Sequence, residues 1–164
     1  MPKYLLRPQG EFPRAGLPRR LAAIFYDFLL CLALLLFVGF LYKLAWIGIY
    51  GVEQLKLMTD SGTMDGDPLL STLLLLSLFG FFSKFWTHGG QTLGMQVWNI
   101  RVQNTDGSAV SLWQALLRFV VAMASWLCLG LGFFWILWDK DRRSWHDIYS
   151  DSYVVQLPKP KPKQ

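Results

Sequence analysis

Charged residues are scarce in this sequence. Of 164 residues, 16 are Lys or Arg and 11 are Asp or Glu, so 16% of the chain is charged, whereas an average soluble domain has about a quarter. Three long stretches are almost free of charge. They are residues 21–42, with only Asp27, residues 69–83, with none, and residues 112–138, with only Arg118. A soluble chain of this size has no core that could bury all three, and the sequence therefore predicts a membrane protein.

Several patterns that enzymes and metalloproteins need are also missing. Cys31 and Cys128 lie inside apolar stretches, which excludes a disulfide framework and a CxxC metal site. His146 stands next to Asp147, but the chain has one other histidine, so we expect a structural or interfacial role for this pair. No arrangement of a nucleophile with a base that is typical of a catalytic site is visible in the sequence. We therefore expect no enzyme, no metal site and no cofactor.

Two further features have a simple interpretation. The net charge of +5 comes from basic residues at the termini and beside the apolar stretches, which favours contact with anionic lipid head groups over nucleic acid binding. The glycine-rich run at residues 89–94 lacks the lysine of a phosphate-binding loop. We interpret it as a turn where the chain leaves the membrane.

The first two apolar stretches are long enough to cross a bilayer. A span needs roughly 20 residues, and residues 21–42 and 69–86 approach or meet that length. About 20 polar residues precede the first stretch and no cleavage site follows it, so we expect an uncleaved anchor. Residues 1–20 hold five basic side chains, whereas residues 43–68 hold two basic and four acidic ones. The positive-inside rule then places the N-terminus in the cytoplasm.

The third stretch, residues 112–138, is too short for two crossings and is interrupted at Gly130 and Gly132. Six basic residues follow it, and a single crossing would put all six outside, against the positive-inside tendency. We therefore favour a broken or re-entrant helical hairpin that enters and leaves on the cytoplasmic side. A plain third crossing remains the alternative.

The segment between the second and third stretches predicts a short cytoplasmic β-hairpin. Apolar and polar residues alternate over residues 98–103, an Asp-Gly turn follows at 106–107, and residues 109–111 supply a return strand. The predicted fold class is thus an all-α membrane protein. It is a small helical bundle with two clear transmembrane helices, a third broken or re-entrant segment and this hairpin. We divide the chain into a basic N-terminal segment (1–17), a transmembrane domain (18–155) and a disordered Lys/Pro tail (156–164).

Two charges lie deep in the apolar stretches. Asp27 is roughly 9 Å into the first helix from its cytoplasmic end, and Arg118 would lie at the same depth in the third stretch. We expect a buried Asp27–Arg118 ion pair, with Lys84 nearer the interface as a second cation. Arg20, at the start of the first helix, should reach the head groups instead. The pair either fixes helix assembly or marks an ion or proton site, because ionisable groups inside membranes often lie on such pathways.

In their order along the chain, several motifs resemble the RDD family of bacterial integral membrane proteins, named for one arginine and two aspartates. Arg20 and Asp27 match the first arginine and the aspartate seven residues later, and Asp147 matches the second aspartate. The chain departs from the family after Asp147, where Ile148-Tyr149-Ser150-Asp151-Ser152 replaces a short Ser/Gly-Thr step. The other matching motifs are Gly89-Gly90-Gln91-Thr92-Leu93-Gly94-Met95, Arg101-Val102, Asp106-Gly107, Leu116-Leu117-Arg118, Trp138-Asp139 and Arg142-Arg143-Ser144-Trp145-His146.

The resemblance implies a multi-pass protein of the bacterial inner membrane, and it implies that Arg20, Asp27 and Asp147 form the functional set. The family's molecular function is generally unassigned, although transport has been suggested and some members are linked to sodium–proton exchange. We therefore carry two hypotheses. One is a small transporter of cations or protons that uses Asp27 with Arg118, and it requires a homo-oligomer because the chain has few spans. The other is a non-transporting scaffold or assembly partner for another membrane protein, in which the pair is structural.

Overall fold

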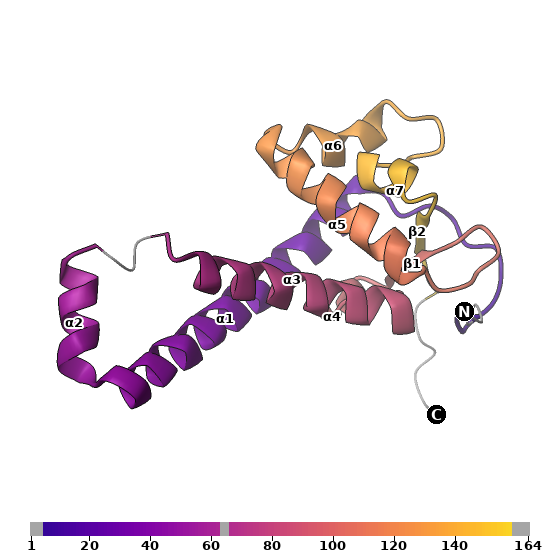
Figure 1. Ribbon diagram of the computed structural model, residues 1–164. Coiled ribbons are helices and arrows are strands. Elements are labelled where there is room, and N and C mark those ends of the chain that lie inside the picture. Colours follow the sequence, from indigo (N-terminus) through magenta and orange to yellow (C-terminus); the bar gives the residue numbers. More distant parts are fainter. Residues whose placement is uncertain (1–4, 63–65, 159–164) are drawn as a thin grey trace. The chain divides into compact units, whose positions relative to one another are not determined.

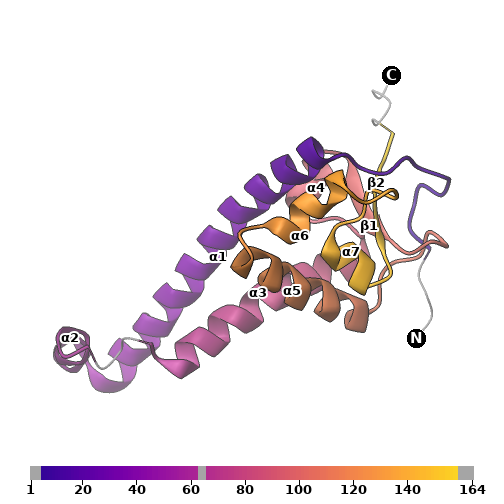
Figure 2. The same cartoon turned by 90° about the horizontal axis from the view of Figure 1, so that it is seen from above.

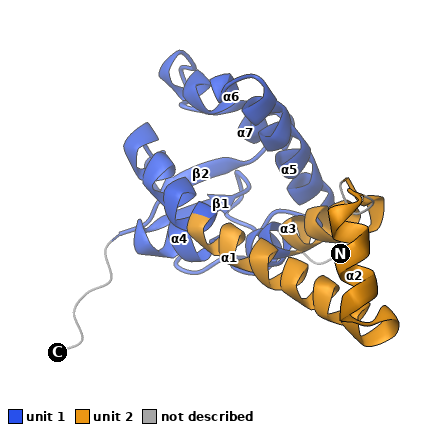
Figure 3. Ribbon diagram, turned by 90° about the vertical axis from the view of Figure 1, so that its left-hand side faces the viewer, with its two compact units in different colours: residues 1–28, 81–164 blue, residues 29–80 orange. Residues whose placement is uncertain are grey.

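The computed structural model describes residues 5–62 and 66–158, and these residues are mostly helical (Figure 1). They fold into two compact units, which Figure 3 shows in different colours. Unit 1 combines residues 1–28 with residues 81–164, and unit 2 consists of residues 29–80. The charged residues singled out in the sequence belong to unit 1.

Two helices are long and apolar enough to span a membrane. They are α1 (Leu17–Tyr50) and α3 (Pro68–His88). Large apolar side chains such as Phe37, Phe40 and Leu76 are exposed on them, as expected for surfaces that face lipid. Both predicted spans are therefore confirmed, and α1 extends past its predicted bounds at both ends.

Unit 2 contains the later part of α1, the short helix α2 (Val52–Asp60) and the first part of α3. Gly51 separates α1 from α2 with a φ of 83°, a conformation that favours glycine. Within this unit the Tyr42 hydroxyl donates a hydrogen bond to the Asp67 carboxylate. This bond connects α1 to the residue that precedes α3.

The third apolar stretch is broken, as predicted. Helix α5 (Leu112–Leu127) is followed by α6 (Leu131–Phe134) and the 3₁₀ turn η1 (Trp135–Leu137), and the two parts are bent by 110°. Leu129 and Gly130 form the break with φ values of 54° and 81°. Helix α5 begins with a capping box in which the Ser111 and Gln114 side chains accept each other's backbone N–H, an arrangement that fixes the start of a helix.

A two-stranded antiparallel sheet is present, but its second strand is not the predicted one. Strand β1 (Ile100–Gln103) pairs with β2 (Tyr153–Gln156), with Arg101 opposite Val155 (Figure 2). Residues 109–111 form no strand. Asn104 instead closes a local turn, in which its backbone N–H donates to the Ser108 carbonyl and its side-chain amide donates to the Ala109 carbonyl.

Residues just before α1 join the same sheet. The Ala15 N–H donates to the Val154 carbonyl at 3.0 Å, and the Gln156 N–H donates to the Pro13 carbonyl at 2.8 Å. Three distant parts of the chain therefore meet here: the start of α1, the segment after α3 and the segment after the bent pair. Most of the predicted tail, residues 159–164, lies outside the described residues.

Candidate functional site

Asp147 is the centre of a buried ion network in unit 1. It lies on the short helix α7 (Trp145–Tyr149) and is 0% exposed. Its Oδ2 accepts from Arg20 Nη1 at 2.5 Å, and its Oδ1 accepts from Arg118 Nη1 at 2.7 Å. One carboxylate thus binds a guanidinium group from α1 and another from α5. It connects α7 to both of these helices, which are labelled in Figure 1.

Local sequence holds this carboxylate in place. Ser144 is the N-cap of α7 and Asp147 is its third residue, so the two form a capping box. The Ser144 hydroxyl and backbone N–H both donate to Asp147 Oδ2, at 2.8 and 3.2 Å. Such a box satisfies N–H groups that the first turn of a helix leaves free. The side chain therefore caps its own helix and pairs with both arginines.

The two arginines use most of their remaining donors on neutral oxygen atoms. Arg20 donates to the backbone carbonyls of Ala15 and Arg142, at 3.1 Å each. Arg118, 1% exposed, donates to the Ser152 hydroxyl at 2.5 Å, and its guanidinium lies 5.3 Å from the Trp86 ring centroid. Arg118 Nε is buried without an acceptor among the described residues. The network is thus closely paired, with two positive charges around one negative charge.

The two arginines also affect the protonation states of Asp147 and His146 on α7. Burial raises the pKa of Asp147, but the charges of Arg20 and Arg118 outweigh burial and hold that pKa well below its usual range. Burial is the main cause that lowers the pKa of the neighbouring His146 to about 3; the charges of Arg118 and Arg20 act in the same direction and that of Asp147 opposes them. At neutral pH the site therefore contains an ionised Asp147 and a neutral His146.

The predicted ion pair between Asp27 and Arg118 is wrong, because Arg118 pairs with Asp147. Arg20 is buried in the same network, so the expectation that it reaches the head groups is also wrong. Lys84 is exposed on α3, and no salt bridge joins it to Asp27 or Arg118 within the described residues. Depth in the membrane had suggested the partner of Arg118, whereas the actual partner follows the bent pair in the sequence.

Asp27 has a separate site. It is buried on α1, where its Oδ2 accepts from the Thr92 hydroxyl at 2.5 Å and its Oδ1 accepts from the Gly94 N–H at 2.9 Å. Thr92 is also the N-cap of the short helix α4 (Leu93–Val97), because its hydroxyl accepts from the Met95 N–H. Among the residues that the structure describes, no basic side chain pairs with Asp27. Its carboxylate is held by two neutral donors alone.

Glycine is required where α4 meets α1. A Cβ atom at position 94 would lie 2.4 Å from the Ala23 carbonyl oxygen and 2.8 Å from Asp27 Oδ1. Neither contact is compatible with a side chain, and the first is to backbone that cannot move aside. Gly94 therefore allows the backbone N–H to approach the carboxylate. In the sequence, Thr92 had an N-cap pattern that could have suggested this contact, because threonine is favoured at that position.

The two sites differ in what they can do chemically. Asp147 has both oxygens engaged by arginines, so it is suited to holding helices together. Asp27 accepts from neutral donors and keeps further lone pairs, so it can take up a proton or contribute oxygen ligands to a cation. Within residues 5–62 and 66–158 no group of three or more His, Cys, Asp or Glu side chains could hold a metal ion.

Comparison with known proteins agrees with these motifs. The chain matches the RDD family over residues 14–151. It is similar to Uncharacterized protein YckC of Bacillus subtilis (strain 168), with 30% identity over 100 residues, which are 58% of this chain and 65% of that protein. The chain thus spans slightly under two thirds of this curated relative, and no solved structure matches it significantly. Since the family match covers most of its length, the chain belongs to the RDD family.

Proposed function

We propose that this protein is a small transporter of cations or protons in which Asp27 is the exchanging group. The observation that carries the proposal is the environment of Asp27. It is a buried carboxylate on a spanning helix, and no basic side chain among the described residues neutralises it. Burial of an uncompensated charge is unfavourable, so binding of a cation or a proton at this carboxylate would be favourable.

Arg118 has a different part in this proposal from the one that the sequence suggested. With Arg20 and Asp147 it forms the frame that holds α1, α5 and α7 together. Asp147 remains ionised far below neutral pH, so this group does not exchange protons in the physiological range. Asp27 then acts without Arg118, and the Thr92 hydroxyl and Gly94 amide hold its carboxylate in place.

The sheet supports a re-entrant course for the bent pair. Strand β1 precedes α5 and strand β2 follows η1, and the two strands are hydrogen-bonded along four residue pairs. A plain crossing by residues 112–138 would put the two strands on opposite faces of the bilayer. We therefore infer two full crossings, α1 and α3, and a bent pair that returns to its side of entry. Broken helices of this kind occur in membranes where protein shields the freed backbone.

This topology requires an oligomer for transport. Two crossings and one re-entrant segment cannot enclose a pathway in one chain, whereas the exposed apolar faces of α1 and α3 can pack against other copies. The proposal therefore predicts a homo-oligomer in the membrane. Cross-linking in native membranes, followed by mass measurement of the purified protein, tests this requirement separately from flux.

The test of function is flux in proteoliposomes. We expect the wild type to exchange protons for sodium or potassium across the vesicle membrane, as read by an internal pH-sensitive dye. The Asp27→Asn variant, which keeps a side chain of the same shape, should lose this flux. Asp151→Asn, at an exposed position in the same unit, should keep it. If the wild type is inert under all cation gradients, or if Asp27→Asn transports like the wild type, the proposal fails.

The second candidate function is an assembly scaffold for another membrane protein. It is supported by the Asp147 network, which fixes α1, α5 and α7 in one arrangement without any exchanging group. In that case Asp27 would help to hold α4 against α1. The scaffold hypothesis expects flux to be absent and expects the same partner to be lost from membrane extracts of Asp147→Asn and Asp27→Asn cells.

A further inference from the structure

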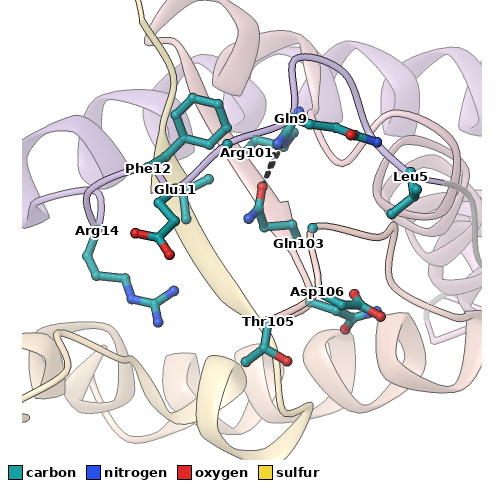
Figure 4. Close-up of a pocket in the computed structure, with 13 residues that line it drawn as sticks. Leu5, Gln9, Glu11, Phe12, Arg14, Arg101, Gln103, Thr105 and Asp106 are labelled. Atoms are coloured by element: carbon teal, nitrogen blue, oxygen red, sulfur yellow. Dashed lines mark hydrogen bonds between the residues drawn. The ribbon is translucent and has the colours of Figure 1, made fainter.

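A cavity of about 710 Å³ lies in unit 1, away from both carboxylates described above (Figure 4). Its wall comes from the N-terminal segment at residues 5–14, from β1 and its following turn at residues 101–107, and from Val155. None of these residues belongs to a spanning helix. Small-molecule sites usually measure about 300–1,000 Å³, so the cavity has room for a compact ligand.

The cavity wall contains a buried arginine without a countercharge. Arg101 is 1% exposed. Its Nε and Nη2 donate to Gln103 Oε1 at 3.0 and 2.6 Å, and Nη2 also donates to the Pro8 carbonyl at 3.1 Å. Figure 4 shows Arg101 and Gln103 together on the cavity wall. Arg101 Nη1 is buried and has no acceptor, and no carboxylate pairs with Arg101 among the described residues.

This arrangement is unfavourable without a ligand. Buried charges in proteins are normally paired, and a guanidinium group stays protonated even where burial lowers its pKa, as it does for Arg101. The acceptors that Arg101 has are both neutral, and one donor has none. An oxyanion would supply the missing charge and the missing acceptor together, because carboxylates and phosphates accept strong hydrogen bonds from arginine.

Acidic side chains on the same wall narrow the ligand class. Glu11 and Asp106 line the cavity together with Arg14 and Arg101, so the formal charge of the lining is balanced. The Asp106 Oδ1 already accepts from Ser108. Glu11 is exposed, and Figure 4 shows its carboxylate beside the cavity. A ligand with an oxyanion at Arg101 and a cationic group toward Glu11 matches this distribution better than a multiply charged anion.

We propose that this cavity binds a zwitterionic molecule in which an oxyanion is joined by a short linker to a primary ammonium group. Arg101 Nη1 donates to the oxyanion, and the Glu11 carboxylate accepts from the ammonium. Such a group occurs both in soluble molecules and in phosphoethanolamine lipid head groups. The proposal does not depend on transport by Asp27, which does not line this cavity.

The soluble arm of the test is calorimetry on the full chain in neutral detergent, with O-phosphoethanolamine as the probe. The wild type should bind it at least about tenfold more tightly than inorganic phosphate, which lacks the ammonium group. Arg101→Gln should weaken binding of both by about tenfold or more, the loss expected for a hydrogen bond to a charged group. Glu11→Gln should remove only the preference over inorganic phosphate, and Glu53→Gln, at an exposed position in unit 2, should change nothing.

The lipid arm compares melting temperatures in nanodiscs made with phosphatidylethanolamine or phosphatidylcholine, whose methylated ammonium group has no N–H to donate. A wild-type melting temperature that is higher in phosphatidylethanolamine, with no such difference for Glu11→Gln, identifies the head group as the source and supports the proposal. Equal binding of O-phosphoethanolamine and phosphate, or the absence of both binding and lipid dependence in the wild type, overturns it. Should Arg101→Gln fail to fold, the exposed Glu11→Gln variant decides alone.

Discussion

Replacement of Asp147 by asparagine should destabilise unit 1 severely. The substitution keeps the shape of the side chain but removes the one negative charge between Arg20 and Arg118, and both guanidinium groups stay buried. Breaking a buried ion pair by removing one partner destabilises a protein by about 3–5 kcal/mol. Asparagine also weakens the capping box with Ser144, which contributes about 1 kcal/mol. The sum, about 4–6 kcal/mol, is a large part of the 5–15 kcal/mol by which typical proteins are stable.

The assay is thermal unfolding of the purified protein in detergent, followed by tryptophan emission, because Trp86 and Trp145 lie close to the network. For a chain of this length we expect the melting temperature to fall by roughly 10 °C or more. Asp151→Asn is the matched control, since Asp151 is exposed and its φ of 46° suits asparagine. Adding Arg118→Met to Asp147→Asn should recover part of the loss, because one unpaired cation is removed. If Asp147→Asn has the same melting temperature as the Asp151→Asn control, the network does not stabilise the fold and the reasoning is refuted.

Four further predictions follow from the same geometry. Thr92→Val should lower stability by about 2–4 kcal/mol, because it removes a helix cap and a hydrogen bond to a carboxylate, whereas Thr92→Ser should melt like the wild type. Gly94→Ala should lower stability by about 1–3 kcal/mol through overpacking against α1. Gly39→Ala should not lower stability, because the added Cβ has open space around it. His146 binds a proton more readily when unfolded, so stability should fall as the pH is lowered from 6.5 toward 3, by up to about 1.4 kcal/mol per pH unit. The matched His146→Gln melting curves should lack that component, and equal slopes would contradict the buried, neutral state of His146. A C-terminal tag should be accessible from the same side as the N-terminus, and accessibility from the opposite side would exclude a re-entrant bent pair.

The sequence predicted the elements of this fold better than their contacts. Apolar length identified α1 and α3, and two glycines in the third stretch marked the region of its break, because these signals are local. The hairpin prediction failed because the pairing of β1 is not local. Residues 109–111 follow an Asp-Gly turn and look like a return strand, but the actual partner of β1 lies 50 residues further along, and nothing in the local pattern of 153–156 shows which strand it joins.

The same limit explains the error at the charged residues. Their position deep in apolar stretches showed correctly that Asp27 and Arg118 are buried, because a charge in such a stretch must be turned away from lipid. It could not show which charge meets which, since Asp147 stands outside every apolar stretch and reaches Arg118 only through the fold of α7. The capping box from Ser144 to Asp147 marks a helix start, and such a pattern alone would not predict an ion network.

The balance of buried charge connects the two proposals. In unit 1 the structure buries Arg20, Arg118 and Asp147 in one network, and their mutual pairing leaves no group that exchanges a proton near neutral pH. It buries two other charges, Asp27 and Arg101, with neutral partners only. A fold selected for stability alone would gain by replacing either one with an uncharged residue, because an uncompensated buried charge is unfavourable. The change in stability caused by Asp27→Asn and by Arg101→Gln, compared with the activity that each one loses, is therefore the most direct measure of which buried charges serve a ligand.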